Sequence, residues 1–231
     1  MLSVRELNQY YGESHTLWDM ALEIPEGSCT CLMGRNGVGK TTLLKTVMGL
    51  LPVRSGAIRF GSQDLTRSPP EARARSGIGY VPQGREIFGQ LTVAENLKVG
   101  LSARSDKERE IPERIFELFP VLKSMLRRRG GDLSGGQQQQ LAIGRALAVN
   151  PKLLLLDEPT EGIQPNIVSQ IAEVLIELNR THGLTILLVE QKLPFARKVA
   201  DRFAIMDRGR AVASGPIAEL DGEVVNKYLT V

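Results

Sequence analysis

Charge of one sign, long apolar runs and cysteine are all scarce in this chain of 231 residues. Lys and Arg number 29 and Asp and Glu 26, so the net charge of +3 gives no argument for a nucleic-acid partner. No apolar run approaches the length of a membrane span, and the N-terminus has no secretory pattern, which predicts a cytosolic protein. Such a protein can still sit on a membrane by binding something embedded there.

The two cysteines, Cys29 and Cys31, lie two residues apart on a predicted strand. Their side chains therefore point to the same face, where they are poorly placed to form a disulfide, and a metal would need further ligands nearby. We interpret them as small core residues. Internal repeats and low-complexity linkers are also absent from the sequence, so we expect one domain with room for a substantial subdomain.

What the chain does have is a complete phosphate-binding loop. The segment Gly34-Arg35-Asn36-Gly37-Val38-Gly39-Lys40-Thr41 fits the pattern G-x-x-x-x-G-K-[ST], between a strand predicted at 28–33 and a helix that begins at Thr42. The glycines let backbone N–H groups point at an anion, and the helix adds the positive end of its dipole. Lys40 would supply a charge to the outer phosphates, and Thr41 a hydroxyl to Mg²⁺. The alternative is an ordinary glycine-rich turn between a strand and a helix.

A second group of candidates follows a run of four leucines. Residues 152–156 are predicted as a central parallel strand, because an apolar run bounded by Pro151 and by acids is typical of a strand buried on both faces. Asp157 and Glu158 follow it at the carboxyl end, where ligands bind in open α/β sheets. Asp157 would hold the Mg²⁺ that Thr41 also contacts, and Glu158 would take a proton from an attacking water. The alternative is a pair of surface acids.

Strands that alternate with helices around the phosphate loop predict an α/β fold with a mostly parallel sheet. Further strands are expected at 3–8, 19–24, 55–61, 77–81, 184–189, 202–207 and 210–215, with a turn at 10–12. Further helices are expected at 69–75, 93–101, 108–119, 136–149 and 193–200, and another with apolar spacing over 167–178 that ends at Gly183. We expect one domain over 1–231, in which a helical subdomain over 83–150 is inserted into a nucleotide-binding core made of 1–82 and 151–231.

The segment Leu133-Ser134-Gly135-Gly136-Gln137 adds a second anion-binding pattern at a predicted helix N-terminus. One phosphate pocket needs only one such cradle, so a second suggests that the nucleotide is held from two sides, by two chains. With these residues the sequence resembles the ATP-binding subunits of ABC transporters over nearly its whole length. Gly34–Thr41 and Leu153–Glu158 match that family's Walker A and Walker B motifs, Leu133–Gln137 its signature motif, and Tyr80-Val81-Pro82-Gln83 its Q-loop.

The resemblance implies a P-loop NTPase (RecA-like) fold with an N-terminal antiparallel β subdomain and an inserted α-helical subdomain, and it implies ATP and Mg²⁺ as ligands. Two cassettes would pack head to tail around two ATP molecules, with the phosphate loop of one facing Ser134–Gln137 of the other. Tyr11 would stack on adenine, Glu158 would be the general base, and Thr41, Gln83 and Asp157 would serve Mg²⁺.

The resemblance also implies partners and a location. The cassette pair would drive integral-membrane permease subunits at the cytoplasmic face of the inner or plasma membrane, and a periplasmic solute-binding protein would act with them indirectly. The helical block after Gln83 would contact the permeases. Arg85 in this block either meets them or is simply solvated.

Two departures from the family pattern concern hydrolysis. Gln191 stands where the family usually has a switch histidine, and Gln164 stands where it usually has the aspartate of the D-loop. A glutamine can hydrogen-bond the γ-phosphate but cannot carry a charge. His15 and His182 are not positioned to substitute, and we expect both at the surface.

Three segments look like the branched-chain amino-acid importer group: Gly162-Ile163-Gln164-Pro165, Val189-Glu190-Gln191-Lys192 and Gly84-Arg85-Glu86-Ile87-Phe88. Within that group, residues 82–88 and 34–39 are most similar to the ATP-binding subunit of the urea importer. Three alternatives remain: a small-molecule kinase, a soluble ABC-type protein that acts on DNA or the ribosome, and an exporter cassette. Leu133–Gln137 argues against the kinase, and the single phosphate loop argues against the second alternative.

Overall fold

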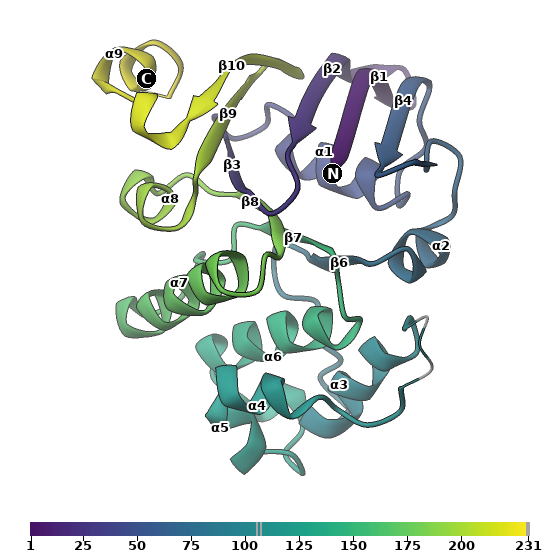
Figure 1. Cartoon of the computed structure of the whole chain (residues 1–231), viewed down its shortest axis with the longest axis vertical. Coiled ribbons are helices and arrows are strands. Elements are labelled where there is room, and N and C mark those ends of the chain that lie inside the picture. The colour runs from purple at the N-terminus through teal and green to yellow at the C-terminus, as the bar shows by residue number, and fades with distance from the viewer. Residues whose placement is uncertain (105, 107, 230–231) are drawn as a thin grey trace.

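The computed structural model describes residues 1–104, 106 and 108–229, which form two β-sheets with helices packed around them (Figure 1). A six-stranded sheet has the order β10-β9-β3-β8-β7-β6, in which β10 is antiparallel to a parallel set, and a four-stranded antiparallel sheet has the order β2-β1-β4-β5. The strands are β1 (Leu2–Tyr11), β2 (Ser14–Ile24), β3 (Cys29–Met33), β4 (Ser55–Phe60), β5 (Gln63–Asp64), β6 (Ile78–Val81), β7 (Leu153–Asp157), β8 (Thr185–Val189), β9 (Arg202–Asp207) and β10 (Arg210–Pro216).

The helices divide into those that cover the sheets and those that form a separate group at one end of the molecule (Figure 1). They are α1 (Lys40–Val47), α2 (Pro70–Arg75), α3 (Val93–Leu101), α4 (Glu113–Leu118), α5 (Pro120–Ser124), α6 (Gly135–Ala148), α7 (Pro165–Arg180), α8 (Leu193–Val199) and α9 (Gly222–Tyr228). Elements α3 to α6 form the separate group. None of the helices in the described part of the chain is long and apolar enough to cross a bilayer.

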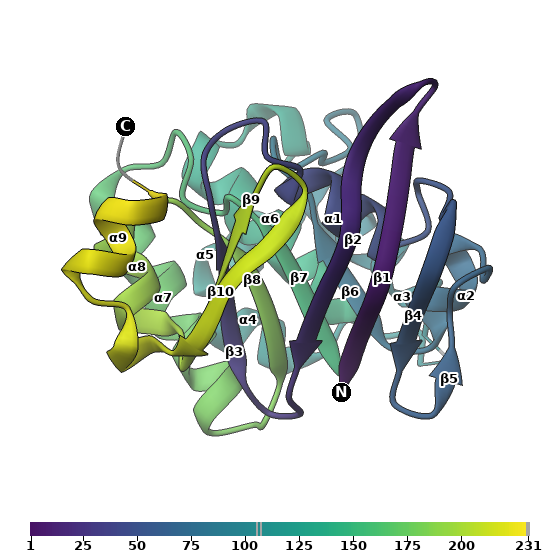
Figure 2. The same ribbon diagram turned by 90° about the horizontal axis from the view of Figure 1, so that it is seen from above.

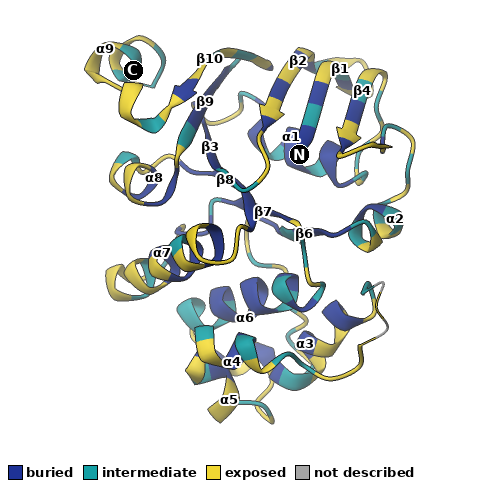
Figure 3. Cartoon of the chain, viewed as in Figure 1, coloured by how far each residue is buried: buried dark blue, intermediate teal, exposed yellow. Residues whose placement is uncertain are grey.

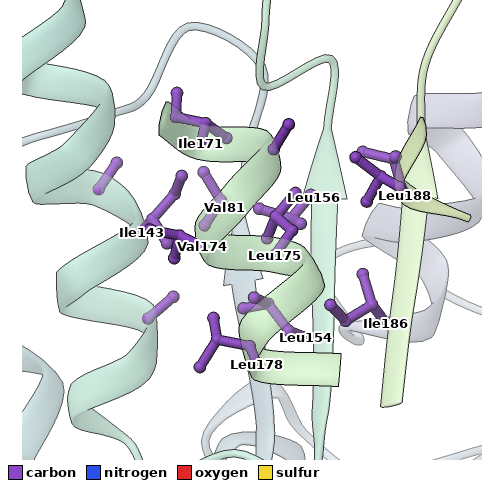
Figure 4. Close-up of a cluster of buried hydrophobic side chains, with 14 of the residues drawn as sticks. Val81, Ile143, Leu154, Leu156, Ile171, Val174, Leu175, Leu178, Ile186 and Leu188 are labelled. Carbon is purple, nitrogen blue, oxygen red and sulfur yellow. The ribbon is translucent and has the colours of Figure 1, made fainter. Parts of the chain in front are cut away.

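The leucine run in β7 is buried on both faces, as the sequence predicts. Leu154 and Leu156 pack in the core on the α7 side of the six-stranded sheet, whereas Leu153 and Leu155 pack in the core that also includes α1 and the four-stranded sheet. Helix α7 buries one apolar face against β7 and β8 (Figure 4) with Ile171, Val174, Leu175 and Leu178. This double burial excludes water from both sides of the strand that ends at Asp157.

The core on the α7 side also contains Cys29 and Cys31, which are buried and free. They lie on one face of β3, as expected from their spacing, and burial raises the pKa of both thiols. Both therefore remain protonated thiols that contribute packing rather than chemistry.

The first two strands are longer than the sequence predicts. Tyr10 and Tyr11 were expected in a turn, but they pair with His15 and Ser14 in an antiparallel hairpin whose loop contains Gly12, with φ of 57°. Glycine takes this left-handed backbone conformation without a steric cost, which allows a two-residue loop. Figure 2 shows the hairpin from above.

The expectation that His15 is a surface residue is only partly met. Its ring is half-buried and stacks on Tyr10, with ring centroids 4.0 Å apart, and its centroid lies 3.6 Å from that of Trp18. His182 is exposed, as expected, and its ring lies 3.7 Å from the carboxylate of Glu177.

The helix expected over 108–119 is wrong at both ends. Helix α4 begins only at Glu113, after Pro112, and it ends before Phe119. The following Pro120 disfavours helical backbone angles at Phe119, which takes φ of −132° and ψ of 72°, and a new short helix starts at Pro120. Figure 3 shows that α4 and α5 have exposed outer faces, while the buried residues of the group lie against α6.

Candidate functional site

The phosphate loop connects the end of β3 to the start of α1, and its glycines take conformations that other residues rarely adopt. Gly34 has φ of 149° and Gly39 has φ of 109°. A Cβ atom on Gly34 would lie 2.3 Å from the backbone oxygen of Met206, and one on Gly39 would lie 2.9 Å from the Met206 side chain. Glycine is therefore required at Gly34 by the close approach of the β9 backbone and at Gly39 by its backbone angle.

Lys40 is buried inside this loop, with 5% of its surface exposed. Its ammonium group donates to the backbone oxygens of Gly34, at 2.8 Å, and Arg35, at 2.9 Å. Burial lowers the pKa of Lys40, and the nearby carboxylates of Glu158 and Asp157 oppose this change. The loop thus holds a positive charge at the N-terminal end of α1, where the helix dipole also favours an anion.

Asp157 lies at the carboxyl end of β7 with only 1% of its surface exposed. Neither carboxylate oxygen accepts a hydrogen bond of ordinary geometry from the residues that the structure describes. Burial raises the pKa of Asp157, while the neighbouring Thr41 hydroxyl lowers it, as does the charge of Lys40. A buried acid without a partner is unfavourable in a finished core, so Asp157 is expected to gain its partner from a ligand.

The residues around Asp157 fit Mg²⁺ better than a metal that requires several side-chain ligands. No group of three or more His, Cys, Asp or Glu side chains that could hold a metal is found in the described part of the chain. Mg²⁺ keeps several waters and commonly takes one or two carboxylates together with phosphate oxygens. The unpaired carboxylate of Asp157 and the adjacent Thr41 hydroxyl are oxygen ligands of this kind.

Glu158 and Gln191 meet at the edge of the phosphate loop. Glu158 has a left-handed backbone, with φ of 47°, and its N–H donates to the backbone oxygen of Val189 on β8. The side-chain amide of Gln191 donates to Oε1 of Glu158, at 2.5 Å, and to Oδ1 of Asn36, at 2.7 Å. Gln191 therefore bridges the expected general base and the phosphate loop, a contact that the sequence alone did not indicate.

Gln83 and Arg85 point toward other parts of the same chain. The amide of Gln83 donates to the carboxylate of Glu161, at 3.0 Å. The guanidinium of Arg85 donates to the Gln138 side chain, at 3.3 Å, and to the backbone oxygen of Glu161, at 3.5 Å. Arg85 is thus not a merely solvated charge, because it connects α6 to the segment after β7.

The second expected cradle stands apart from the phosphate loop. Ser134 caps α6 by accepting from the N–H of Gln137, whose side chain accepts from the N–H of Ser134. These residues line a hollow of about 450 Å³ together with Gly162, Gln164 and Ile167, and the described phosphate-loop residues do not line it. Tyr11 is also exposed, at 48%, at the end of β1. The chain therefore carries the phosphate loop and the hollow at Ser134–Gln137 at two separate places.

Three residues beside the site were missed by the sequence reasoning. Glu190 is buried, Thr160 donates to its carboxylate at 2.6 Å, and Lys192 donates to the backbone oxygen of Thr160 at 3.0 Å. The sequence contains a signal for Glu190, because this acid follows the apolar strand β8 just as Asp157 ends the apolar strand β7.

The sequence is similar to known proteins of one family. The family model described as "ABC transporter" matches residues 17–161, more than half of the chain. The branched-chain amino acid transport ATP-binding protein BraG of Pseudomonas aeruginosa is 44% identical over 92% of this chain and 91% of its own length. The probable branched-chain amino acid transport ATP-binding protein LivF of Archaeoglobus fulgidus is 39% identical over 95% of this chain and 94% of its own length.

Solved structures give the same result for the fold. A nucleotide-free ATP-binding cassette from an ABC transporter superposes with a TM-score of 0.83 and 29% identity, over 100% of this chain and 95% of the other. The cassette MJ0796, solved as a dimer in a post-hydrolysis state with ADP and Pi, has a TM-score of 0.83 and 25% identity, over 94% of this chain and 99% of the other.

We predict that Asp157→Asn stabilises the protein in the absence of nucleotide. Burial keeps the pKa of Asp157 above its usual range, so the charged form lowers stability at pH 7.5, and the substitution removes that charge. The gain in melting temperature should shrink as pH falls through the raised pKa toward about 4, the usual value for an unfolded aspartate, because the wild-type carboxyl is then neutral too.

Circular dichroism melts at pH 4 to 8 measure this difference, with Asp132→Asn as the control at an exposed acid. Adding ATP and Mg²⁺ should raise the melting temperature of the wild type more than that of Asp157→Asn. A lower melting temperature for Asp157→Asn at pH 7.5 without nucleotide would contradict the interpretation of Asp157 as an unpaired buried charge.

Proposed function

Because this chain belongs to the ABC transporter family, we propose that it powers an importer of branched-chain amino acids as its ATP-hydrolysing subunit, acting through separate membrane permease subunits. The family supplies the ATPase activity and the use of ATP with Mg²⁺. One observation carries the chemical part of the proposal. The buried, unpaired carboxylate of Asp157 faces a phosphate loop that holds the buried ammonium of Lys40.

The roles of the remaining residues follow from their contacts. Lys40 would bind the outer phosphates, while Thr41 and Asp157 would hold Mg²⁺, which supplies positive charge to the phosphate oxygens when bound. Glu158 would accept the proton of the attacking water, and the Gln191 amide at its Oε1 atom would orient it. Gln83 would approach the metal only after leaving Glu161, which its amide contacts in this structure.

Two copies of the chain would complete the site. The hollow at Ser134–Gln137 combines a helix N-terminus with backbone N–H groups, which suits phosphate oxygens, but no lysine lines it among the described residues. The phosphate loop has the lysine but exposes Asn36 and Gly37 on its open side. Head-to-tail packing would bring the hollow of each chain to the phosphate loop of the other, and the dimeric structure of the cassette MJ0796 supports an assembly of two cassettes. Tyr11 would then stack on adenine.

The proposed partners are the permease subunits, a second copy of this chain or a related cassette, and indirectly a periplasmic solute-binding protein. The protein would then sit at the cytoplasmic face of the membrane. The helical group α3 to α6 would contact the permeases within the proposed division into a core (1–82 and 151–231) and a helical insertion (83–150). Similarity to BraG and LivF supports branched-chain amino acids as the cargo, and urea remains the alternative on the segments 82–88 and 34–39.

We predict that Glu158→Gln leaves ATP binding intact but lowers hydrolysis by at least about 100-fold, because the amide cannot accept the proton of water. The substitution should also trap an ATP-bound dimer. Phosphate release measures the first effect, and light scattering with ATP and Mg²⁺ measures the second. Glu173→Gln is the matched control at an exposed acid on α7, and hydrolysis by Glu158→Gln at the wild-type rate would exclude Glu158 as the base.

We also predict that Ser134→Arg abolishes hydrolysis, because the larger side chain would occupy the hollow that receives the phosphates of the second chain. The control is Ser124→Arg on the exposed end of α5, which should hydrolyse ATP at the wild-type rate. Melting curves would show that both variants fold. If purified Ser134→Arg remained active, a site shared between two chains would be ruled out.

Reconstitution with the permeases encoded by neighbouring genes tests the cargo. We expect ATP-dependent uptake of radiolabelled leucine into proteoliposomes, and no uptake above background with Glu158→Gln. Urea uptake without leucine uptake would replace the proposed cargo with its alternative. ATP-dependent efflux of a substrate in the same system would favour an exporter cassette.

A further inference from the structure

Glu190 is a buried acid whose hydrogen bonds go to two different loops. It has 3% of its surface exposed and directly follows β8. One carboxylate oxygen accepts from the backbone N–H groups of Gln191, at 2.8 Å, and Lys192, at 3.0 Å. The other accepts from the hydroxyl of Thr160, at 2.6 Å. This carboxylate is therefore paired on both oxygens, unlike that of Asp157.

A second hydrogen bond joins the same two loops, and in this one the donor belongs to the segment 190–192. The ammonium of Lys192 donates to the backbone oxygen of Thr160, at 3.0 Å. The segment 159–164, which leads from β7 to α7, and the segment 190–192, which leads from β8 to α8, are thus fastened at one point from both sides. The backbone N–H of Glu190 also donates to Leu32 on β3, the strand that enters the phosphate loop.

The loops that Glu190 joins have separate contacts at their outer ends. Segment 190–192 carries Gln191, whose amide contacts Glu158 and Asn36. Segment 159–164 contributes Gly162 and Gln164 to the hollow at Ser134. A short hydroxyl–carboxylate bond in a buried setting is stronger than a neutral hydrogen bond, and it is not weakened by water. A shift of one loop would therefore move the other.

We propose that Glu190 is a positioning residue for ATP hydrolysis, which fixes Gln191 relative to the loop 159–164 through the hydroxyl of Thr160. Gln191 in turn holds Glu158 against the phosphate loop, so the geometry of the general base depends on the position of the loop 159–164. This inference rests on the proposed function, in which Glu158 is the general base and the loop 159–164 lies beside the surface that receives the second chain. A movement of the loop when the chains meet would then reach Glu158 through Glu190.

Thr160→Val tests the link, because valine has nearly the shape of threonine but carries a methyl group in place of the hydroxyl. We expect kcat for ATP hydrolysis to fall about tenfold, since a displacement of 1 Å in an active site costs about 100-fold and a smaller shift is expected here. KM for ATP should stay within about twofold, because Lys40 and the loop glycines that would bind the phosphates are untouched. Thr160→Ser keeps the hydroxyl and should restore kcat.

The matched control is Thr185→Val at the opposite end of β8. Thr185 is equally buried, and its hydroxyl accepts from the N–H of Gly27, at 2.9 Å, far from the loops that Glu190 joins. Thr185→Val should lower the melting temperature about as much as Thr160→Val does, and it should leave kcat unchanged. Lys192→Met removes the second bond at an exposed residue, so it should fold normally and lower kcat about threefold.

Wild-type kcat in both Thr160→Val and Lys192→Met would overturn the inference. So would an equal loss of kcat in Thr185→Val, because the effect would then follow general stability rather than this link. If Glu158→Gln formed no ATP-bound dimer, the two-chain proposal would be wrong. The ratio of kcat between Thr160→Val and Thr160→Ser would still test the role of Glu190.

Discussion

The buried, unpaired charge of Asp157 constrains the architecture around it. A carboxylate at 1% exposure without a hydrogen-bond partner lowers stability, so it is tolerated only where the surrounding structure is stable enough to hold it. Leucines on both faces of β7 provide that support, because they place apolar side chains in two separate cores. The parallel sheet then puts Asp157 at the same edge as the phosphate loop after β3, where Lys40 partly offsets its charge.

The fold class could be predicted from sequence because its signals are local. The leucine run, the glycine pattern at 34–39 and the serine–glycine pattern at 134–136 each contain their own physical reason within a few residues. A run buried on both faces requires a parallel sheet with helices on both sides. Once that sheet is assumed, the carboxyl ends of its strands meet at one edge, and Asp157 and Lys40 are expected near each other without any further information.

Other features depend on contacts between segments far apart in the chain, which no local pattern reports. The bond from Gln191 to Asn36 joins residues separated by 155 positions, and the bond from Gln83 to Glu161 joins residues separated by 78. The early hairpin was misjudged for a related reason. Two tyrosines before a glycine fit a turn as well as a strand end, and cross-strand pairing with Ser14 and His15 decides between them.

Asp157 and Glu190 stand at the ends of neighbouring parallel strands and are both buried, yet the donors around their carboxylates differ. Glu190 accepts from two backbone N–H groups and one hydroxyl, so its charge is already satisfied and its position is fixed. Among the described residues, no hydrogen bond of ordinary geometry reaches either oxygen of Asp157, and the nearby Thr41 hydroxyl lowers its pKa. A buried carboxylate with few donors gains stability from a cation, which is consistent with the proposed Mg²⁺ site at Asp157. A carboxylate with three donors has little room for another partner, which is consistent with the proposed joint between loops at Glu190.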